Sequence, residues 1–407
     1  MKNMKTAKLF TLLVLTLTIS NLSAQKIGKD TFGKGIFNSV AKDSTWSMKF
    51  GLRMQYLTSV GLDADANNNF DFDPKNLQTD TKVRRYRLKF DGFVLSPKVK
   101  YKIELGMSNN DTGSSNEYTK LGPKLILDAV LKWNFYKNLE IWAGQTKLPG
   151  NRERVISSAN MQLVDRSILN REFTLDRDMG FQLRNHHTIG KQFLIREVFA
   201  ITQGEGRNIT TGNVGGQQYT SRIEFLPYGT FTSKGDYKGG DLKREPKPKL
   251  SVGLTYNHND RASRQRGSQG SIIELIDDSG SPEDHVFATT DVNTSFVDFM
   301  YKHNGYSMMG EFAYRNADDT TIGTNPVKVG KGYNLTAGYL FHNNYEITTR
   351  YSQVDYKGIA NTKEQYTVGV SKYIVGHALK IQTDLSYTTV DGASDGLQYR
   401  LQFEVHF

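Results

Sequence analysis

The chain contains no cysteine, so it can form no disulfide bond and no lipid-modified N-terminal cysteine. Beyond residue 24, no segment approaches the roughly 20 apolar residues that a membrane-spanning helix needs. Only 9 of the 407 residues are proline, which leaves room for long uninterrupted strands. The abundance of aromatic residues, 21 Tyr, 22 Phe and 3 Trp, argues against a disordered chain, because disordered chains are poor in them.

The N-terminus has the features of a secretory signal peptide over residues 1–24. Three lysines precede a short apolar core, Phe10 to Ile19, and small residues at Ser23-Ala24 provide a cleavage site. The core is too short to span a membrane, which disfavours a retained anchor. Residues 25–46 are polar and fit no strand pattern, so we expect a polar N-terminal segment ahead of a single β-domain at 47–407.

Alternation of apolar and polar residues dominates the chain after residue 46. The last eleven residues show it most clearly, because their apolar side chains fall on every second position: Leu397, Tyr399, Leu401, Phe403, Val405 and Phe407. Such a strand separates two environments. A soluble sandwich would turn the apolar side into a core, whereas a membrane barrel would turn it into lipid and keep a polar lumen. Periodicity alone does not separate these two folds.

The spacing of the strands favours the barrel over a sandwich or a jelly roll. Short connections, such as Ser96-Pro97, alternate with long ones, and an even strand number with this asymmetry is typical of outer-membrane barrels. One connection, 226–248, should be short and is not. We therefore predict an all-β fold, a transmembrane antiparallel barrel of about 16 strands with short periplasmic turns and long extracellular loops. The candidate strands lie at 48–56, 85–91, 99–107, 127–135, 139–145, 179–185, 193–201, 218–225, 249–257, 296–302, 306–315, 333–341, 345–352, 364–372, 379–387 and 397–407.

Four stretches of the chain carry a family resemblance: 82–92, 126–133, 144–154 and 204–208. Together they resemble the phosphate-selective porin O and P family, whose members are outer-membrane anion porins, and the likeness extends from about residue 47 to Phe407. The most specific stretch runs from Gly144 to Arg154. The resemblance implies a 16-stranded trimeric barrel that passes anions, with an inward-folded third loop and basic residues lining the pore. It does not fix which anion is carried.

Two neighbouring candidate strands carry lysine and arginine at every second position. That spacing, about 6.6 Å, places each set on one side of its strand. If both sets face the lumen, they form one basic wall, and lumen charges tune the selectivity of a pore. The alternative is ordinary lumen charge that Asp91, Glu104 and Asp128 balance. The basic wall comprises Arg85, Arg87, Lys89, Lys98, Lys100 and Lys102.

The third long loop, 146–177, is also rich in cations. We expect it to fold inward and narrow the channel, an expectation that rests on loop order and on the family resemblance. Arginine suits phosphate because its planar guanidinium binds two oxygens at once. The alternative is an external loop whose charges are solvated. The anion-binding candidates in this loop are Lys147, Arg152, Arg154, Arg166 and Arg171, and Arg177 ends it.

Other functions find little support. There is no His-Glu-x-x-His motif, so we expect no enzyme activity and no cofactor. The acidic run of the first long loop lacks the Gly and Glu of a calcium-binding loop, so we expect no metal site. The pI of 9.3 alone suggests nucleic acid, but a secreted chain with cations spread along barrel strands argues against that partner.

The sequence therefore predicts a porin in the outer membrane of a Gram-negative type, diderm bacterium. Its basic lumen would admit small anions by passive diffusion, with phosphate or related anions as candidates. The alternatives are a general or differently selective porin and, less favoured, a barrel adhesin or a membrane-embedded enzyme. The expected partners are membrane lipid, small anions, two further copies in a homotrimer, and the β-barrel assembly machinery at Phe407.

Overall fold

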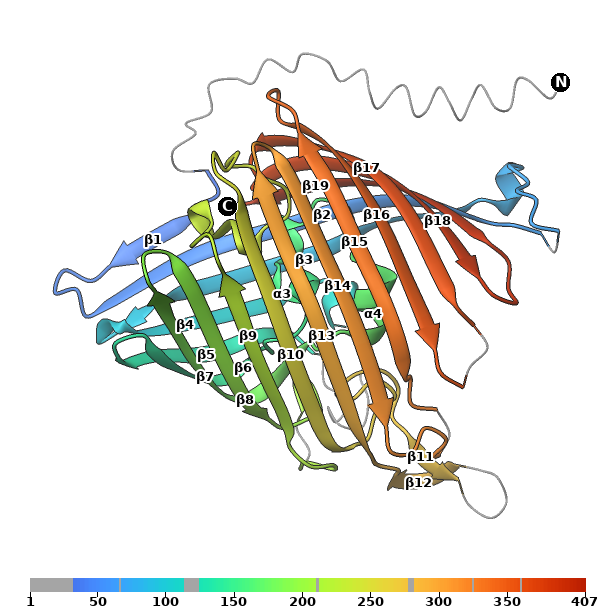
Figure 1. Ribbon diagram of the computed structural model, residues 1–407, viewed down its shortest axis with the longest axis horizontal. Helices are drawn as coiled ribbons and strands as arrows, with labels where there is room; N and C mark the ends of the chain where they lie inside the picture. The colour runs from blue at the N-terminus through green and yellow to red at the C-terminus, as the bar shows by residue number, and fades with distance from the viewer. Residues whose placement is uncertain are drawn as a thin grey trace.

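The computed structural model describes residues 32–65, 67–112, 124–209, 212–276, 282–323, 326–358 and 361–407, and the expected signal peptide lies outside them. Sixteen antiparallel strands form a closed barrel, in which each strand pairs with the next and β19 returns to pair with β2 (Figure 1). The barrel strands are β2 (Trp46–Asp63), β3 (Gln78–Val94), β4 (Ser96–Gly106), β5 (Ile126–Tyr136), β6 (Leu139–Lys147), β7 (Arg177–Ile189), β8 (Phe193–Thr202), β9 (Gln218–Leu226), β10 (Lys249–Ala262), β13 (Thr290–His303), β14 (Tyr306–Ala317), β15 (Gly330–Leu340), β16 (Tyr345–Tyr356), β17 (Lys363–Val375), β18 (Leu379–Val390) and β19 (Gly396–His406).

The two faces of the barrel wall have opposite character. On β19, Arg400, Gln402 and Glu404 point inward and are buried, whereas Phe403 points outward and is 42% exposed. Inward polar and outward apolar side chains are the arrangement of a membrane barrel, so the predicted barrel of 16 strands is confirmed. Within the described residues, no helix is long and apolar enough to cross a membrane.

The N-terminal segment contains a strand that the sequence did not indicate. β1 (Phe37–Val40) runs antiparallel to the first residues of β2, from Phe37 opposite Phe50 to Val40 opposite Ser47. The Asp43 carboxylate accepts a hydrogen bond from the Thr45 amide at 3.1 Å, in the turn that joins the two strands. The expectation that 25–46 fits no strand is therefore wrong for this part, because four residues are too few to show an alternation.

Long loops gather at one end of the barrel and short turns at the other. The first long loop is 64–77, shorter than the gap between the candidate strands 48–56 and 85–91, because β2 and β3 extend well beyond their alternating apolar segments. Short elements decorate the long-loop end: η1 (Pro74–Asn76), α2 (Asn109–Thr112), β11 (Glu274–Ile276) and β12 (Pro282–Phe287). At the other end, β13 and β14 are joined by Asn304 and Gly305, both with positive φ.

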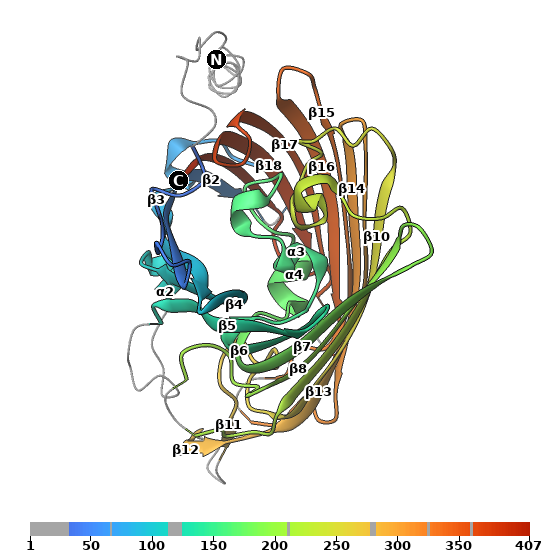
Figure 2. The same ribbon diagram turned by 90° about the vertical axis from the view of Figure 1, so that its left-hand side faces the viewer.

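Loop 3, which we define as residues 148–176, lies inside the barrel (Figure 2). It contains α3 (Arg152–Val155), η3 (Ser158–Asn160) and α4 (Ile168–Phe173), and α4 contacts β14 to β17. Leu169 and Phe173 are completely buried in one apolar cluster with inward-facing wall residues such as Phe296 and Val354. The predicted inward folding is confirmed, and burial of these apolar side chains, at about 1.5–3 kcal/mol each, favours it.

A second segment enters the barrel from the short-turn end. We call residues 227–248, between β9 and β10, the inner connection; it contains η4 (Thr232–Tyr237). The Lys302 ammonium donates to the carbonyls of Gly235 and Lys238, both at 2.9 Å, and the Gly239 amide donates to the Asn160 carbonyl of loop 3 at 2.6 Å. β9 and β10 pair without a shift, so the unusual length is an enlarged turn and not a slip of register.

Candidate functional site

Loop 3 divides the lumen into two sides. Its back side faces β8 to β10 and β13 to β19, and its front side faces β3 to β7 (Figure 2). On the back side, the fully buried Arg152 lies 3.0 Å from Glu224 and 3.1 Å from Asp298, and it donates to Ser251 Oγ at 2.8 Å. Arg152 therefore anchors loop 3 to the barrel wall.

Further ion pairs hold the rest of the loop to the wall, on the back side and at Arg84 of β3. Arg350 lies 3.5 Å from Glu153, which also accepts the Ser167 hydroxyl at 2.5 Å at the start of α4. Asp165 lies 2.6 Å from Arg84 and 3.6 Å from Arg400. Burial opposes ionisation of Asp165, but these arginines outweigh it and hold the pKa of the carboxyl well below its ordinary value.

Arg85 begins the front side and owes its position to a bulge. Gln55 pairs with Arg85, but Tyr56 pairs with Val83, so Arg84 is an extra residue and both arginines are buried inside the barrel. Arg85 donates to the neutral Gln55 Oε1 at 2.6 Å. Its electrostatic neighbours are other arginines, and no carboxylate of the described residues lies within 4.0 Å of it.

The side chains of Lys147 and Arg166 also donate to neutral oxygens and not to carboxylates. The Lys147 ammonium donates to the carbonyls of Arg154 at 2.6 Å and Ile156 at 3.2 Å. Arg166 donates to the carbonyls of Glu153 at 3.0 Å and, again, Ile156 at 2.9 Å. No described carboxylate lies within 4.0 Å of either charged group, although the Arg166 main-chain amide donates to Asp165 Oδ1 at 2.9 Å. Burial, assisted by the charge of Arg154, lowers the pKa of Arg166 to about 9, which leaves it cationic at neutral pH. We call Arg85, Lys147 and Arg166 the front cations.

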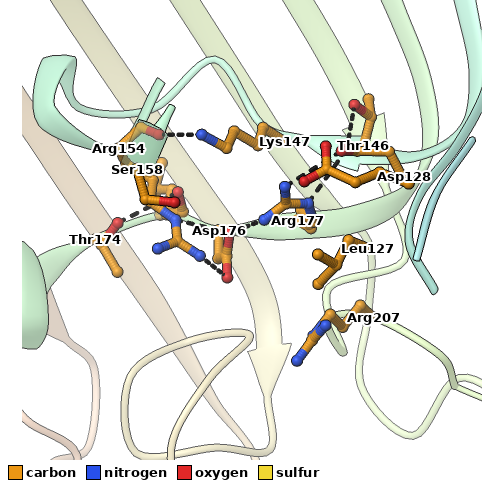
Figure 3. Close-up of polar contacts among 12 residues, drawn as sticks. Leu127, Asp128, Thr146, Lys147, Arg154, Ser158, Thr174, Asp176, Arg177 and Arg207 are labelled. Atoms are coloured by element: carbon orange, nitrogen blue, oxygen red, sulfur yellow. Dashed lines mark hydrogen bonds and ion pairs between the residues drawn. The ribbon is translucent and has the colours of Figure 1, made fainter. Parts of the chain in front are cut away.

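Next to the front cations lies a row of paired charges (Figure 3). Arg154 contacts Asp176 with its Nε at 2.7 Å, and Arg177 lies 3.6 Å from Asp176 and 3.2 Å from Asp128. Burial opposes ionisation of Asp176, but Arg154 and Arg177 keep its pKa well below the ordinary value. Arg207 approaches from the loop after β8 and donates to main-chain carbonyls.

The stretch 144–154, which carries the most specific family resemblance, begins with a glycine that the packing of β5 and β6 requires. Gly144 has φ +123°, and a Cβ there would lie 2.2 Å from the Ala129 carbonyl oxygen of the neighbouring strand. Only glycine fits this close approach of β5 and β6. The same short stretch of β6 then delivers Lys147 and the start of loop 3.

The predicted basic wall does not form one continuous surface. Arg87 is paired with Asp111 and Glu104, and Lys102 with Glu104 and Asp128. Among the remaining members, Lys89 lies 2.8 Å from Asp91, and Lys98 and Lys100 are exposed close to the turn that joins β3 and β4. Half of this wall, Arg87, Lys89 and Lys102, therefore corresponds to the balanced lumen charge that was the alternative interpretation.

Two of the candidate residues of loop 3 lie away from the front cations. Arg171 has a side chain that is 79% exposed and lies at the long-loop end, while Arg152 lies behind the loop. The sequence missed Arg84, because no pattern announces a bulge. It also missed Lys132 and Arg184, which an extension of the alternation to β5 and β7 would have placed inside. No group of three or more His, Asp or Glu side chains in the described ranges is placed to hold a metal ion.

Comparison with known proteins agrees with this geometry. The family model described as phosphate-selective porin O and P matches residues 56–404. Among solved structures, an anion-selective porin from Comamonas acidovorans aligns with a TM-score of 0.54 at 12% identity, covering 89% of this chain and 100% of that one. The outer membrane channel DcaP of Acinetobacter baumannii gives 0.53 at 12% identity, covering 90% and 99%. No curated protein matches the sequence.

Proposed function

The chain belongs to the phosphate-selective porin O and P family, a family of outer-membrane channels, and from that premise we propose that it passes small anions by diffusion along the front side of its barrel. The front cations carry this proposal. Arg85, Lys147 and Arg166 are basic side chains that lie inside the barrel and donate their hydrogen bonds to neutral acceptors.

A cation that donates to a carbonyl or an amide keeps its net charge, whereas one paired with a carboxylate does not. A passing anion loses part of its hydration in a narrow channel, and fixed cations compensate for that loss. Several weak sites in series also conduct better than one tight site, because the ion must leave as well as enter. Three cations without acidic partners fit this requirement.

Phosphate is the candidate substrate. Arg85 and Arg166 each offer a planar guanidinium, which matches phosphate oxygens better than a lysine ammonium does. The family description supports the same anion. A general or differently selective porin is the rival, and it would use the same cations without a preference for phosphate.

Bilayer recordings test both the preference for anions and the interaction with phosphate. Reversal potentials across a potassium chloride gradient should show anion preference, and added phosphate should reduce the chloride current. Cation preference would overturn the anion pathway, while anion preference without block by phosphate would favour the general porin. Arg171→Ala is the matched control, because it removes one arginine from the exposed end of the same loop.

Assembly and secretion complete the proposal. We propose a homotrimer, in keeping with the family, and removal of the 1–24 segment on secretion. We also propose that the end of β19 is recognised by the assembly machinery. The Phe407 amide donates to the Leu52 carbonyl at 2.9 Å and so continues the pairing of β19 with β2. Deletion of Phe407 should lower the amount of folded, heat-modifiable protein, and unchanged assembly would contradict this role.

A further inference from the structure

A second cationic region lies between the front cations and the periplasmic end of the barrel. A cavity of about 590 Å³ is enclosed there by the start of loop 3, by the wall from β4 to β9, and by the inner connection. Lys147 lines it, so it is continuous with the front side. Seven Lys and Arg residues line this inner cavity against three Asp and Glu residues, and we ask which ligand such a lining would take.

The centre of the cavity wall is an indole flanked by two cations. The Lys132 ammonium lies 3.8 Å from the ring centroid of Trp142, and the Arg184 guanidinium carbon lies 3.9 Å from it. Because β5 and β7 flank β6, the two cations reach the indole from its two sides. The Trp142 Nε1 donates to Glu140 at 2.9 Å, which fixes the ring between them.

These two cations remain available to a ligand. Arg184 donates to the neutral Gln182 Oε1 at 2.7 Å, and no described carboxylate lies within 4.0 Å of Lys132 or Arg184. Of the three acids of the cavity, Asp128 pairs with Lys102 and Arg177, and Glu224 pairs with three arginines. The third, Glu140, accepts the Trp142 indole N–H and offsets part of the positive charge. An indole stabilises a cation without neutralising it. The inner cavity therefore keeps a positive charge.

The rest of the lining is not polar. Leu148 and Pro149 of loop 3 and Leu194 of β8 give the cavity an apolar side, and Lys234 of the inner connection adds an exposed cation at its periplasmic side. Cavities of this volume hold organic molecules. Inorganic phosphate would satisfy the cations but leave the apolar side uncovered.

We propose that the inner cavity is a binding site for phosphate monoesters that carry a small apolar group, with Lys132 and Arg184 at the phosphate. The arginine fork and the ammonium provide several donors to the phosphate oxygens, and the apolar side accepts the organic group. This inference rests on the proposed anion pathway and names a larger substrate class for it.

The test compares phenyl phosphate with inorganic phosphate as blockers of the chloride current in a lipid bilayer. In the unchanged protein, phenyl phosphate should block at a concentration about tenfold lower. Lys132→Gln combined with Arg184→Gln should abolish this difference and change block by inorganic phosphate less than about twofold. Trp133→Ala is the matched control, because Trp133 is 53% exposed on the outer side of β5. Equal block by the two compounds, or a difference that survives the double substitution, would overturn the site.

Two further measurements keep the result interpretable. Lys234 is an exposed residue of the inner connection and belongs to no barrel strand, so Lys234→Gln should weaken block by phenyl phosphate about threefold without affecting folding; an unchanged block would contradict the site. Benzoate has the same ring with a single charge and should block less, and equal block would overturn the assignment to a phosphate ester. A channel without anion preference in chloride alone would instead refute the proposed function. The comparison of the two blockers tests the inner cavity separately from that preference.

Discussion

The two sides of loop 3 use the same residue types for opposite purposes. Behind the loop, Arg152 meets Glu224 and Asp298, and Arg350 meets Glu153. In front of it, the front cations donate to carbonyl and amide oxygens only. What distinguishes them is the acceptor and not the arginine or lysine itself. A carboxylate converts the cation into a structural anchor, and a neutral acceptor positions it while its charge stays available to a passing ion.

The largest effect is expected from breaking an anchor on the back side. Arg152→Ala removes the only described cation that loop 3 places between Glu224 and Asp298, and it leaves buried carboxylates with fewer partners. Loss of one partner of a buried ion pair costs about 3–5 kcal/mol. Urea unfolding of the refolded barrel in detergent measures this cost, and the loop should become more susceptible to protease. A cost no larger than that of Arg171→Ala would contradict the anchoring role.

A smaller effect is expected from inverting one front cation. Arg85→Glu places a negative charge among Arg84, Arg87 and Arg166. At about 8 Å and an effective dielectric constant near 20, one unit charge contributes about 2 kcal/mol, which is more than tenfold in ion occupancy. Reversal potentials should shift strongly toward cations. Inverting the carboxylate-paired Arg87 is the comparison, and an equal shift there would remove the distinction between paired and unpaired cations.

Removing the carboxylate partner of a cation should have the opposite effect and increase anion preference. Asp176→Asn removes the carboxylate that Arg154 and Arg177 share while keeping its size. The front side then gains net positive charge, and anion preference and block by phosphate should increase several-fold, for about 1 kcal/mol. Circular dichroism and heat-modifiability confirm that the variant is folded. An unchanged selectivity would show that Arg154 and Arg177 do not reach the pathway.

The smallest effect is expected at the exposed end of loop 3. Arg171→Ala removes a side chain that is 79% exposed and has only Glu172 nearby, at 3.8 Å. Solvent screens such a charge, so stability should change by less than about 0.5 kcal/mol and selectivity by less than about twofold. A large change in reversal potential would place part of the selectivity at the extracellular mouth.

The barrel could be read from the sequence because its signal is local. A strand between lipid and water must alternate, and sixteen segments do so, including the last one with Phe403 outside and Gln402 inside. The exception at 226–248 was visible as an exception, but its inward fold was not. That fold depends on partners far along the chain, such as Lys302 and Asn160, which no local pattern connects to it.

The site was only partly predictable for a related reason. Sequence placed Arg85, Arg87 and Lys89 on one side of a strand, and it could not show that Asp111 of a loop helix would pair with Arg87. The bulge at Arg84 also has no sequence signature. Whether a lumen cation is free or neutralised is set by tertiary contacts, and this property separates the front cations from the rest of the candidates.

The most direct measurement is the reversal potential of a triple variant, Arg85→Gln, Lys147→Gln and Arg166→Gln, across a potassium chloride gradient. These changes remove the three unpaired charges and keep polar side chains that can still donate to the same neutral oxygens. The account predicts loss of anion preference and of block by phosphate in a folded, conducting barrel. An anion preference equal to that of the unchanged protein would contradict it.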